Sequence, residues 1–473
     1  ARRADPRGPP GAPAVSPEDA AGVGAGRADP ADPDAPIAAL KRRDPGKARL
    51  HDGVADVLRS VAGLVRDRPD WREARVLERL AEPDRVIAFR VVWEDDDNRL
   101  HVNRGWRVQH SNAIGPYKGG LRFRGDVDEE VLRLLAFEQT FKNALTGLPM
   151  GGAKGGADFE PKGRSVSEIM RFCGAFMTEL HRDIGPEIDV PAGDIGVGER
   201  EIGFMFGQHK RLTGRFSGAL TGKGLEFGGS CLRREATGYG VVHFLEAMLE
   251  RRGEAVEGLT AAVSGAGNVA GHAAEQIVRR GGRVVTLSDS RGLLHVPGGL
   301  DEAALRWIRE RRADPEFRLE RAAGPLDATW RPGERPWRVP CDLALPCATE
   351  NEVGRDDVET LAANGCRALV EGANMPLSAE ARAAIGEAGL LHGPGKAANL
   401  GGVAMSGLEI SQNAARLHRD EAELSDSLRR IMRESHDACV AHGEGRDGVD
   451  YVRGADAAGF VKVAEAMTAF GAV

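Results

Sequence analysis

The chain has 473 residues, of which 41% are hydrophobic and 29% charged, and its formal net charge is −7. This length predicts more than one domain, and the negative charge argues against a nucleic-acid-binding protein. No run of about 18 apolar residues occurs, so we expect no transmembrane helix and no membrane partner. The six cysteines form no C-x-x-C pair. We therefore expect no disulfide framework, no metal site and a reducing compartment, the cytoplasm.

Residues 1–36 are rich in Ala, Pro, Gly, Asp and Arg and show no hydrophobic period. Such a segment buries too little apolar surface to offset the entropy of ordering, so we expect a disordered extension. A targeting peptide is the alternative, but it would be acid-poor and serine-rich, and Ser16 is the only serine here. From Ala38 to about Ala81, apolar residues recur at helical spacing, which predicts helices.

The rest of the first half mixes strands and helices. The β-branched runs at 86–93 and 102–108 predict two paired strands, and residues 129–145 predict a helix. We interpret the glycine-rich segments between them as turns. The first half is therefore expected to form an α/β domain.

The second half alternates strands with helices. Short apolar runs at 259–264, 283–288, 341–346 and 368–371 predict strands, and residues 268–280 predict a helix. Strand–helix alternation with short links is typical of a parallel, doubly wound sheet.

A G-x-G-x-x-A fingerprint, Gly265-Ala-Gly-Asn-Val-Ala270, links the first two of these strands through the helix. Gly265 would permit a tight turn and Gly267 the close approach of a pyrophosphate, while N–H groups at Asn268 and Val269 would hold its charge. Asp289 lies at the end of the second strand, about 20 residues after Gly267. An acidic residue at that place binds the hydroxyl groups of the ribose. An ordinary strand–helix turn with packing glycines is the alternative.

Three of the ten lysines, Lys118, Lys142 and Lys154, lie close together in sequence and near glycines, and Asp194 also lies between glycines. Ammonium groups sharing a cleft would bind a dicarboxylate and lower one another's pKa. A lysine tuned in this way can act as a base or polarise a carbonyl. With a nicotinamide cofactor, the set indicates oxidation of an amine or alcohol next to a carboxylate.

Interpretations without a catalytic role also stay open for these lysines. Lys142 would then form a surface pair with Glu138, and Lys154 and Asp194 would lie in a flexible glycine-rich loop. A P-loop is excluded, because Lys154 comes one place late and no Ser or Thr follows it.

Together these motifs resemble the glutamate dehydrogenase family, in its small hexameric bacterial branch, from about Ala38 to Val473. The resemblance rests on Val91-Val-Trp93, Gly115-Pro-Tyr-Lys-Gly-Gly120, Phe137-Glu-Gln-Thr-Phe-Lys-Asn-Ala-Leu145, Leu148-Pro-Met-Gly-Gly152, Lys154-Gly-Gly156, Val190-Pro-Ala-Gly-Asp-Ile-Gly196, Glu235-Ala-Thr-Gly-Tyr-Gly240, Glu371-Gly-Ala-Asn-Met-Pro376 and Gly395-Lys-Ala-Ala-Asn399.

The resemblance implies an α/β fold with an N-terminal substrate-binding domain and a Rossmann-type, doubly wound dinucleotide-binding domain. We expect the extension at 1–36, the substrate-binding domain at 37–228 with a returning C-terminal helix at 450–473, and the Rossmann domain at 229–449. The resemblance also implies a homohexamer.

For the substrate, the resemblance implies that Lys118 and Ser406 bind the side-chain carboxylate of glutamate, and that Lys142, with Gln139 nearby, binds the α-carboxylate. The activity implied is reversible oxidative deamination of L-glutamate to 2-oxoglutarate and ammonia, run toward ammonium assimilation. A dehydrogenase for apolar amino acids is the alternative, and it should carry apolar residues at positions 118 and 406.

For catalysis, the resemblance makes Lys154 the residue that activates water and polarises the carbonyl, and Asp194 the one that exchanges a proton with the amine. A non-catalytic, nucleotide-sensing protein is a further alternative, and it should lack one of these two. The implied cofactor contacts are Thr237, Asn268, Asn374 and Asn399.

The choice between NADP and NAD is less direct. Resemblance to the biosynthetic branch implies NADP, with Ser290, Arg233 and Arg311 near the 2′-phosphate. Asp289 favours the free 2′-hydroxyl of NAD, so an NAD-preferring enzyme of the same family stays the alternative.

Overall fold

The computed structural model describes residues 29–312, 314, 316–446 and 448–472. Most of the predicted extension, residues 1–36, lies outside the described residues. Regular structure begins at Asp34, slightly before the predicted boundary, because Ile37 and Leu40 of the first helix are buried in a hydrophobic cluster. The predicted helical segment after it is divided into four helices, which are α1 (Asp34–Arg43), α2 (Ala48–Arg66), α3 (Pro69–Glu73) and α4 (Val76–Leu80).

The first domain is built on a mixed five-stranded sheet with the order β1-β2-β4-β3-β5. Its strands are β1 (Arg85–Glu94), β2 (Leu100–Ser111), β3 (Tyr117–Phe123), β4 (Gly152–Ala157) and β5 (Asp189–Gly193). Strands β1, β2 and β4 pair antiparallel, whereas β3 lies parallel to both β4 and β5. The predicted strand pair is therefore confirmed as β1 and β2.

The interpretation of the glycine-rich segments as turns was wrong for β3, β4 and β5, which are buried strands. Their glycines let neighbouring strands and helix α5 approach closely. A Cβ atom on Gly119 would lie 1.6 Å from the carbonyl oxygen of Ala153, and one on Gly152 would lie 1.9 Å from Oγ1 of Thr140. Lys118 and Lys154 are consequently held on strands and not in flexible loops.

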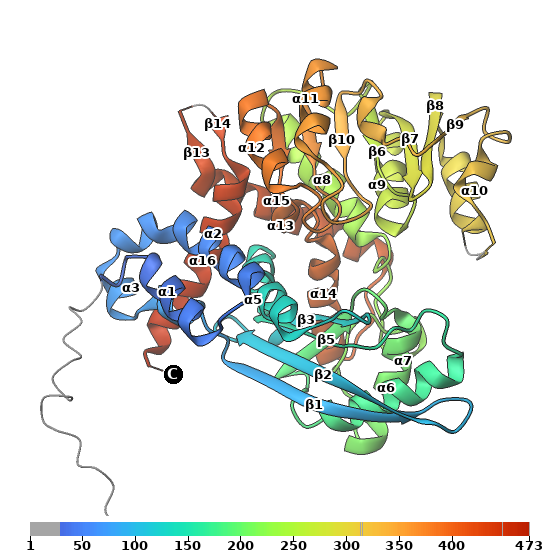
Figure 1. The fold of residues 1–473 in the computed structure, drawn as a ribbon. Coiled ribbons are helices and arrows are strands. Elements are labelled where there is room, and N and C mark those ends of the chain that lie inside the picture. The colour runs from blue at the N-terminus through green and yellow to red at the C-terminus, as the bar shows by residue number, and fades with distance from the viewer. Residues whose placement is uncertain (1–28, 313, 315, 447, 473) are drawn as a thin grey trace, which may run out of the picture.

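Helices cover both faces of this sheet (Figure 1). On one face, α6 (Val166–Leu180) and α7 (Glu199–Thr213) pack against Leu121 and Phe123 of β3. On the other, α5 (Glu129–Leu145) packs against Trp106 and Val108 of β2. Because side chains alternate along a strand, Lys118 and Arg122 of β3 point to the α5 face.

The second domain contains a seven-stranded sheet with the order β12-β11-β10-β6-β7-β8-β9. Its strands are β6 (Thr260–Val263), β7 (Arg283–Asp289), β8 (Gly292–Leu300), β9 (Thr329–Pro332), β10 (Leu343–Leu345), β11 (Ala368–Val370) and β12 (Leu391–Gly393). The five strands from β12 to β7 are parallel, as predicted, and β8 and β9 add an antiparallel edge.

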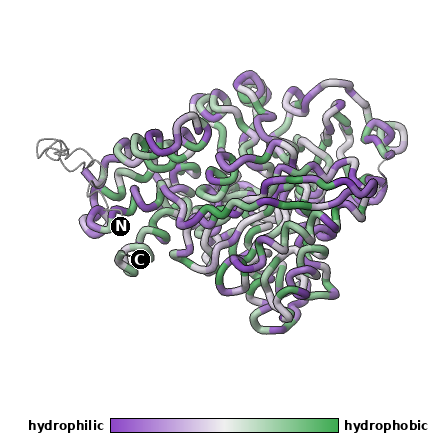
Figure 2. The backbone as a smooth tube through the Cα atoms, turned by 60° about the horizontal axis from the view of Figure 1, so that its bottom comes forward, coloured by the Kyte–Doolittle hydropathy of each residue, from purple (hydrophilic) through white to green (hydrophobic). Residues whose placement is uncertain are grey.

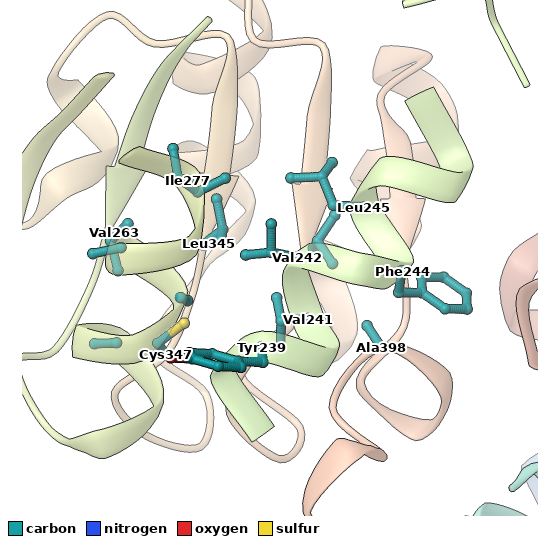
Figure 3. Packing of buried hydrophobic residues seen from close by; sticks show 14 of the residues in the cluster. Tyr239, Val241, Val242, Phe244, Leu245, Val263, Ile277, Leu345, Cys347 and Ala398 are labelled. Atoms are coloured by element: carbon teal, nitrogen blue, oxygen red, sulfur yellow. The ribbon is translucent and has the colours of Figure 1, made fainter. Parts of the chain in front are cut away.

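The helices of this domain are α8 (Ala236–Glu250), α9 (Asn268–Arg279), α10 (Glu302–Arg311), α11 (Arg355–Ala363), α12 (Ala379–Ala388), α13 (Gly395–Ala398), α14 (Gly401–Ala415) and α15 (Glu421–Gly443). Short elements join them: η1 (Leu225–Phe227), η2 (Leu319–Ala322), η3 (Pro336–Arg338), β13 (Glu444–Gly445) and β14 (Gly448–Val449). In the core, Val242 of α8 lies beside Leu345 of β10 (Figure 3).

The last helix, α16 (Tyr451–Phe470), returns to the first domain. Its residues Phe460, Val463 and Met467 join the cluster formed by α1 to α5, and α16 packs beside α3 (Figure 1). Hydrophilic residues gather on the outer turns of both domains, with hydrophobic stretches between them (Figure 2). In the part of the chain that the structure describes, no helix is long and apolar enough to cross a membrane.

Candidate active site

Lys118 is a buried lysine whose ammonium group has no partner among the described residues. It lies on β3 with only 2% of its surface exposed. Its backbone carbonyl accepts a hydrogen bond of 3.0 Å from Nδ2 of Asn143, which fixes the strand against α5. Among the described residues, no carboxylate or carbonyl contacts its ammonium group. Burial, followed by the charges of Arg233 and Arg107, lowers the pKa of Lys118 well below its ordinary value.

Lys142 connects the two domains. It lies on α5, and its Nζ donates hydrogen bonds to Oδ1 of Asn399 and, at 3.4 Å, to Oδ1 of Asn374. Burial, followed by the charge of Lys154, lowers the pKa of Lys142 to about 8. The alternative of a surface pair with Glu138 was wrong, since amide oxygens of the second domain are the partners of Lys142.

Lys154, which is buried, and Asp194, which is partly buried, form an ion pair. Nζ of Lys154, on β4, lies 2.8 Å from Oδ2 of Asp194, which directly follows β5. Nε of Arg122, on β3, donates to the same oxygen at 2.9 Å. Although burial alone raises the pKa of Asp194, the charges of Lys154 and Arg122 lower it to about 2. The flexible-loop alternative was therefore wrong for both predicted catalytic residues.

Gln139 and Ser406 approach this region from α5 and α14. Nε2 of Gln139 donates to Oδ1 of Asn143 at 2.7 Å, so Asn143 joins Gln139 to the backbone of Lys118. Ser406 is 2% exposed on α14, one turn before Glu409, whose charge acts on Lys118. Glu409 itself is neutralised by a fully buried pair with Lys223 at 2.9 Å, which leaves the charge of Lys118 unpaired.

The fingerprint takes the form of an anion cradle at the start of α9. Gly265 has a φ of +80°, and its N–H donates to Oγ of Ser288 at 2.9 Å. A Cβ on Gly267 would meet no atom within 4 Å, so space is open above it. Within the described chain, the N–H groups of residues 266–270 form no hydrogen bond, and those of Asn268 and Val269 open the helix. Unpaired N–H groups beside open space fit the pyrophosphate of a dinucleotide.

The predicted ribose-binding residues are only partly brought together. Asp289 ends β7 and accepts a hydrogen bond from the N–H of Arg291 at 2.8 Å, and Ser290 is exposed beside it. Arg311 stacks on Trp307, one turn earlier on α10, with 3.9 Å from its guanidinium carbon to the ring centre. No contact joins it to Asp289 or Ser290 within the described residues.

Arg233 lies elsewhere than predicted. Its Nη1 is 3.4 Å from the position that a Cβ on Gly402 would take, at the start of α14, and its charge acts on Lys118. Its Nε is buried and has no hydrogen-bond partner among the described residues. Arg233 precedes α8, whose first turns pack on α14, and this packing carries the side chain toward Lys118. This geometry favours the substrate side over the 2′-phosphate for Arg233.

Of the remaining predicted cofactor residues, Thr237 packs within the second domain, whereas Asn374 and Asn399 meet Lys142 of the first. Oγ1 of Thr237 is 2.5 Å from the position that a Cβ on Gly402 would take, and Gly238 packs against the first turn of α9. Asn399 donates to Oδ1 of Asn374 at 3.3 Å, so both amides sit beside Lys142. No group of three His, Cys, Asp or Glu side chains suited to a metal ion occurs in the part that the structure describes.

Three residues of the site were missed in the sequence. Arg122 contacts Asp194, Asn143 joins three segments, and Ser288 supports the fingerprint turn. Arg122 was obscured by the abundance of arginine in this chain. Period-two alternation with Lys118 would have placed it on the same face of a strand, had β3 been predicted as one.

Fold and site together define an amino-acid dehydrogenase, and comparison with known proteins agrees. The model of the Glutamate/Leucine/Phenylalanine/Valine dehydrogenase family matches residues 228–471, and the model of the Glu/Leu/Phe/Val dehydrogenase dimerisation domain matches residues 83–211. The chain belongs to this family. Its relatives place it, more narrowly, among the glutamate dehydrogenases.

One relative is the NADP-specific glutamate dehydrogenase of Salmonella typhimurium, 52% identical over 434 residues that cover 92% of this chain and 97% of that protein. Another, the NAD-specific glutamate dehydrogenase of Bacteroides fragilis, is 47% identical over 92% of this chain and 99% of its own length. Among solved structures, Plasmodium falciparum glutamate dehydrogenase superposes with a TM-score of 0.91 at 43% identity, covering 93% of this chain and 95% of that one.

Proposed function

We propose that this chain catalyses the reversible, NADP-dependent oxidative deamination of L-glutamate to 2-oxoglutarate and ammonia. The observation that carries the substrate assignment is the buried ammonium group of Lys118, which has no partner among the described residues. A desolvated charge is costly unless an opposite charge pairs with it. A carboxylate on the substrate side chain meets that requirement, and an apolar side chain does not.

Two further donors support a carboxylate beside Lys118. They are the buried hydroxyl of Ser406 and Nε of Arg233, which has no hydrogen-bond partner among the described residues. Lys142 and Gln139, on one face of α5, are suited to the α-carboxylate, because they lie one turn apart and beside the second domain. Substrate would then be held by its two ends.

We assign the chemistry to Lys154 and Asp194. A bound nicotinamide supplies the hydride acceptor for the α-carbon. Asp194 accepts a proton from the substrate ammonium group, which frees the amine lone pair. Once the α-carbon has lost its hydride, Lys154 in its neutral form accepts a proton from a water molecule that attacks the iminium carbon. The nitrogen then takes back the proton held by Asp194 and leaves as ammonia, and the carbonyl forms as the hydroxyl proton is released to solvent. The ion pair of 2.8 Å supports this assignment of roles, since it places Nζ of Lys154 and the carboxylate of Asp194 in contact.

Several features support NADP as the cofactor. The Salmonella relative is NADP-specific, and Ser290 is exposed beside the end of β7, where a 2′-phosphate would lie. Asp289 at the same place favours NAD, in line with the NAD-specific Bacteroides relative. Fluorescence titration compares the binding of NADPH and NADH, and steady-state kinetics compare their catalytic efficiencies. Equal or better catalytic efficiency with NADH would contradict NADP preference.

We further propose a homohexamer that works in the cytoplasm toward ammonium assimilation. The match to a dimerisation domain supports self-association, and the six free thiols suit a reducing compartment. We place the domain boundary at residues 228 and 229, with residues 450–473 belonging to the first domain. The packing of α16 on α5 and α2 supports that division.

A direct assay tests the proposed function. Purified chain is mixed with NADPH, ammonium and 2-oxoglutarate, and oxidation of NADPH is followed by absorbance. We expect turnover that requires all three, with far less activity on the 2-oxo acids of leucine, valine or norleucine. Preference for an apolar oxo acid, or cofactor binding without turnover, would contradict the proposal.

A further inference from the structure

Asp194 holds two cations on a single oxygen atom. Nζ of Lys154 and Nε of Arg122 lie 2.8 and 2.9 Å from Oδ2, and both basic side chains are more than nine-tenths buried. The proposed reaction gives Lys154 a second task, which is to contact the reacting part of the substrate. It gives no task to Arg122.

The strand register makes the two contacts unequal. Leu121 of β3 is paired with Gly193 of β5, so the next residues, Arg122 and Asp194, stand directly side by side. Leu121 is also paired with Gly155 of β4, which places Lys154 level with Gly120. Lys154 therefore reaches Asp194 across a glycine. A Cβ on Gly120 would come within 2.8 Å of Cβ of Asp194.

We propose that Arg122 is a positioning residue that keeps Asp194 oriented and charged while Lys154 leaves that carboxylate to contact the substrate. This inference rests on the proposed function. Arg122 stands directly beside Asp194 in the strand register, whereas Lys154 reaches it with a flexible four-carbon chain that crosses Gly120, which has no side chain. A guanidinium also keeps its charge at every working pH, while an ammonium group can lose its proton.

The charges that act on Asp194 agree with separate roles for Arg122 and Lys154. They come from Lys154 on β4, Arg122 on β3 and Lys142 on α5. When Lys154 turns to the substrate, Arg122 is the one remaining direct contact of the carboxylate among the described residues. Without Arg122, the freed carboxylate would rotate away or bind a proton, and it could not accept one from the substrate amine.

A double-mutant cycle with Asp194 tests the inference, because a purely structural role would be independent of that residue. The variants are Arg122→Met, Asp194→Asn and their combination, with Arg122→Lys as the conservative change. Arg124→Met is the matched control, since Arg124 lies just beyond the same strand and pairs with the exposed Asp126. Steady-state kinetics on glutamate and NADPH dissociation constants are measured for each.

We expect Arg122→Met to lower kcat at least about tenfold while KM and the NADPH dissociation constant change less than about threefold. In the Asp194→Asn background the same change should cost less than about twofold. Arg122→Lys should restore part of the loss, and Arg124→Met should resemble wild type.

Equal losses in both backgrounds, or near-normal turnover of Arg122→Met, would overturn the inference. If Arg122→Met does not fold, Arg122→Gln carries the same cycle, because it keeps a donor and removes the charge. A wild-type chain inactive on glutamate would overturn the proposed function and this inference with it. An active wild type with an active Arg122→Met would overturn this inference alone.

Discussion

Three lysines of one domain differ in what surrounds their ammonium groups. Lys118 has no partner among the described residues, Lys142 meets amide oxygens, and Lys154 meets a carboxylate. The first is suited to attract an anion, the second to bind one at the domain junction, and the third to exchange contacts during a reaction. The same side chain thus serves three purposes because its surroundings differ.

Removal of the Lys154–Asp194 pair should affect turnover more than binding. Lys154→Ala removes the group that activates water, and Asp194→Asn preserves shape but cannot accept a proton. Each should raise the barrier by at least about 3 kcal/mol, roughly a hundredfold in rate. Stopped-flow measurement of the chemical step, with NADPH titration as the binding control, checks this. Near-normal turnover in either variant would rule out its role.

Lys142 should make dicarboxylate binding depend on pH. Its pKa is about 8, so the free enzyme carries this charge below pH 8 and loses it above. Glutarate has both carboxylates of the substrate and no amine, so its affinity should weaken above that pH by up to about tenfold per unit. Calorimetry between pH 7 and 9.5 measures it. Lys142→Gln should reduce this dependence and leave the part that comes from Lys118, whose pKa is also lowered by burial. Constant affinity in wild type would contradict the assignment.

Close packing between strands explains why β3 and β4 contain several glycines. Gly119→Ala would place a Cβ 1.6 Å from the carbonyl oxygen of Ala153, so the strands must separate. We expect the midpoint of thermal unfolding to fall by several degrees, since overpacking of this kind costs about 1–3 kcal/mol or more. Calorimetry compares it with Gly63→Ala, on an exposed turn of α2 with no atom within 4 Å. Equal midpoints would contradict this packing argument.

Elements with a strong periodic pattern were predictable from the sequence. Helix α5 has the predicted bounds, and β6, α9 and β7 agree within a residue or two. Strands β3, β4 and β5 were not predictable, because glycine carries neither hydrophobic alternation nor strand propensity. Their burial follows from neighbours distant in sequence.

The chemical set of the site was predictable because lysine is rare here and clustered. The placement of the arginines was not, since the segment before α8 carries Arg233 toward α14, whereas α10 holds Arg311 against Trp307. Sequence distance does not show which domain face a long side chain reaches.

In the part of the chain that the structure describes, β1 is the end strand of the five-stranded sheet, with no strand paired on its outer side. Val92 and Val102 stand opposite each other on β1 and β2, and both are exposed, as is Leu100. Exposed apolar residues on an edge hairpin are typical of an interface. Sedimentation should give a mass of about six times the 50.5 kDa of one chain. A monomer at micromolar concentration would contradict the proposed hexamer.

We infer that Lys118, whose ammonium group has no partner among the described residues, selects glutamate together with the hydroxyl of Ser406. The decisive measurement is the ratio of kcat/KM for glutamate to that for norleucine, in wild type and in the Lys118→Leu, Ser406→Val double variant. The control is the double variant Lys210→Leu, Ser411→Val. Lys210 is an exposed lysine of α7, and Ser411 lies on α14, the helix that carries Ser406.

We predict that the double variant loses glutamate efficiency by two or more orders of magnitude, about 3 kcal/mol for a charge-assisted hydrogen bond. Norleucine efficiency should fall less or rise, because the cost of burying an unpaired charge is gone. The control should keep the wild-type ratio. An unchanged ratio in the double variant would mean that Lys118 and Ser406 do not read the side-chain carboxylate, which would contradict the account.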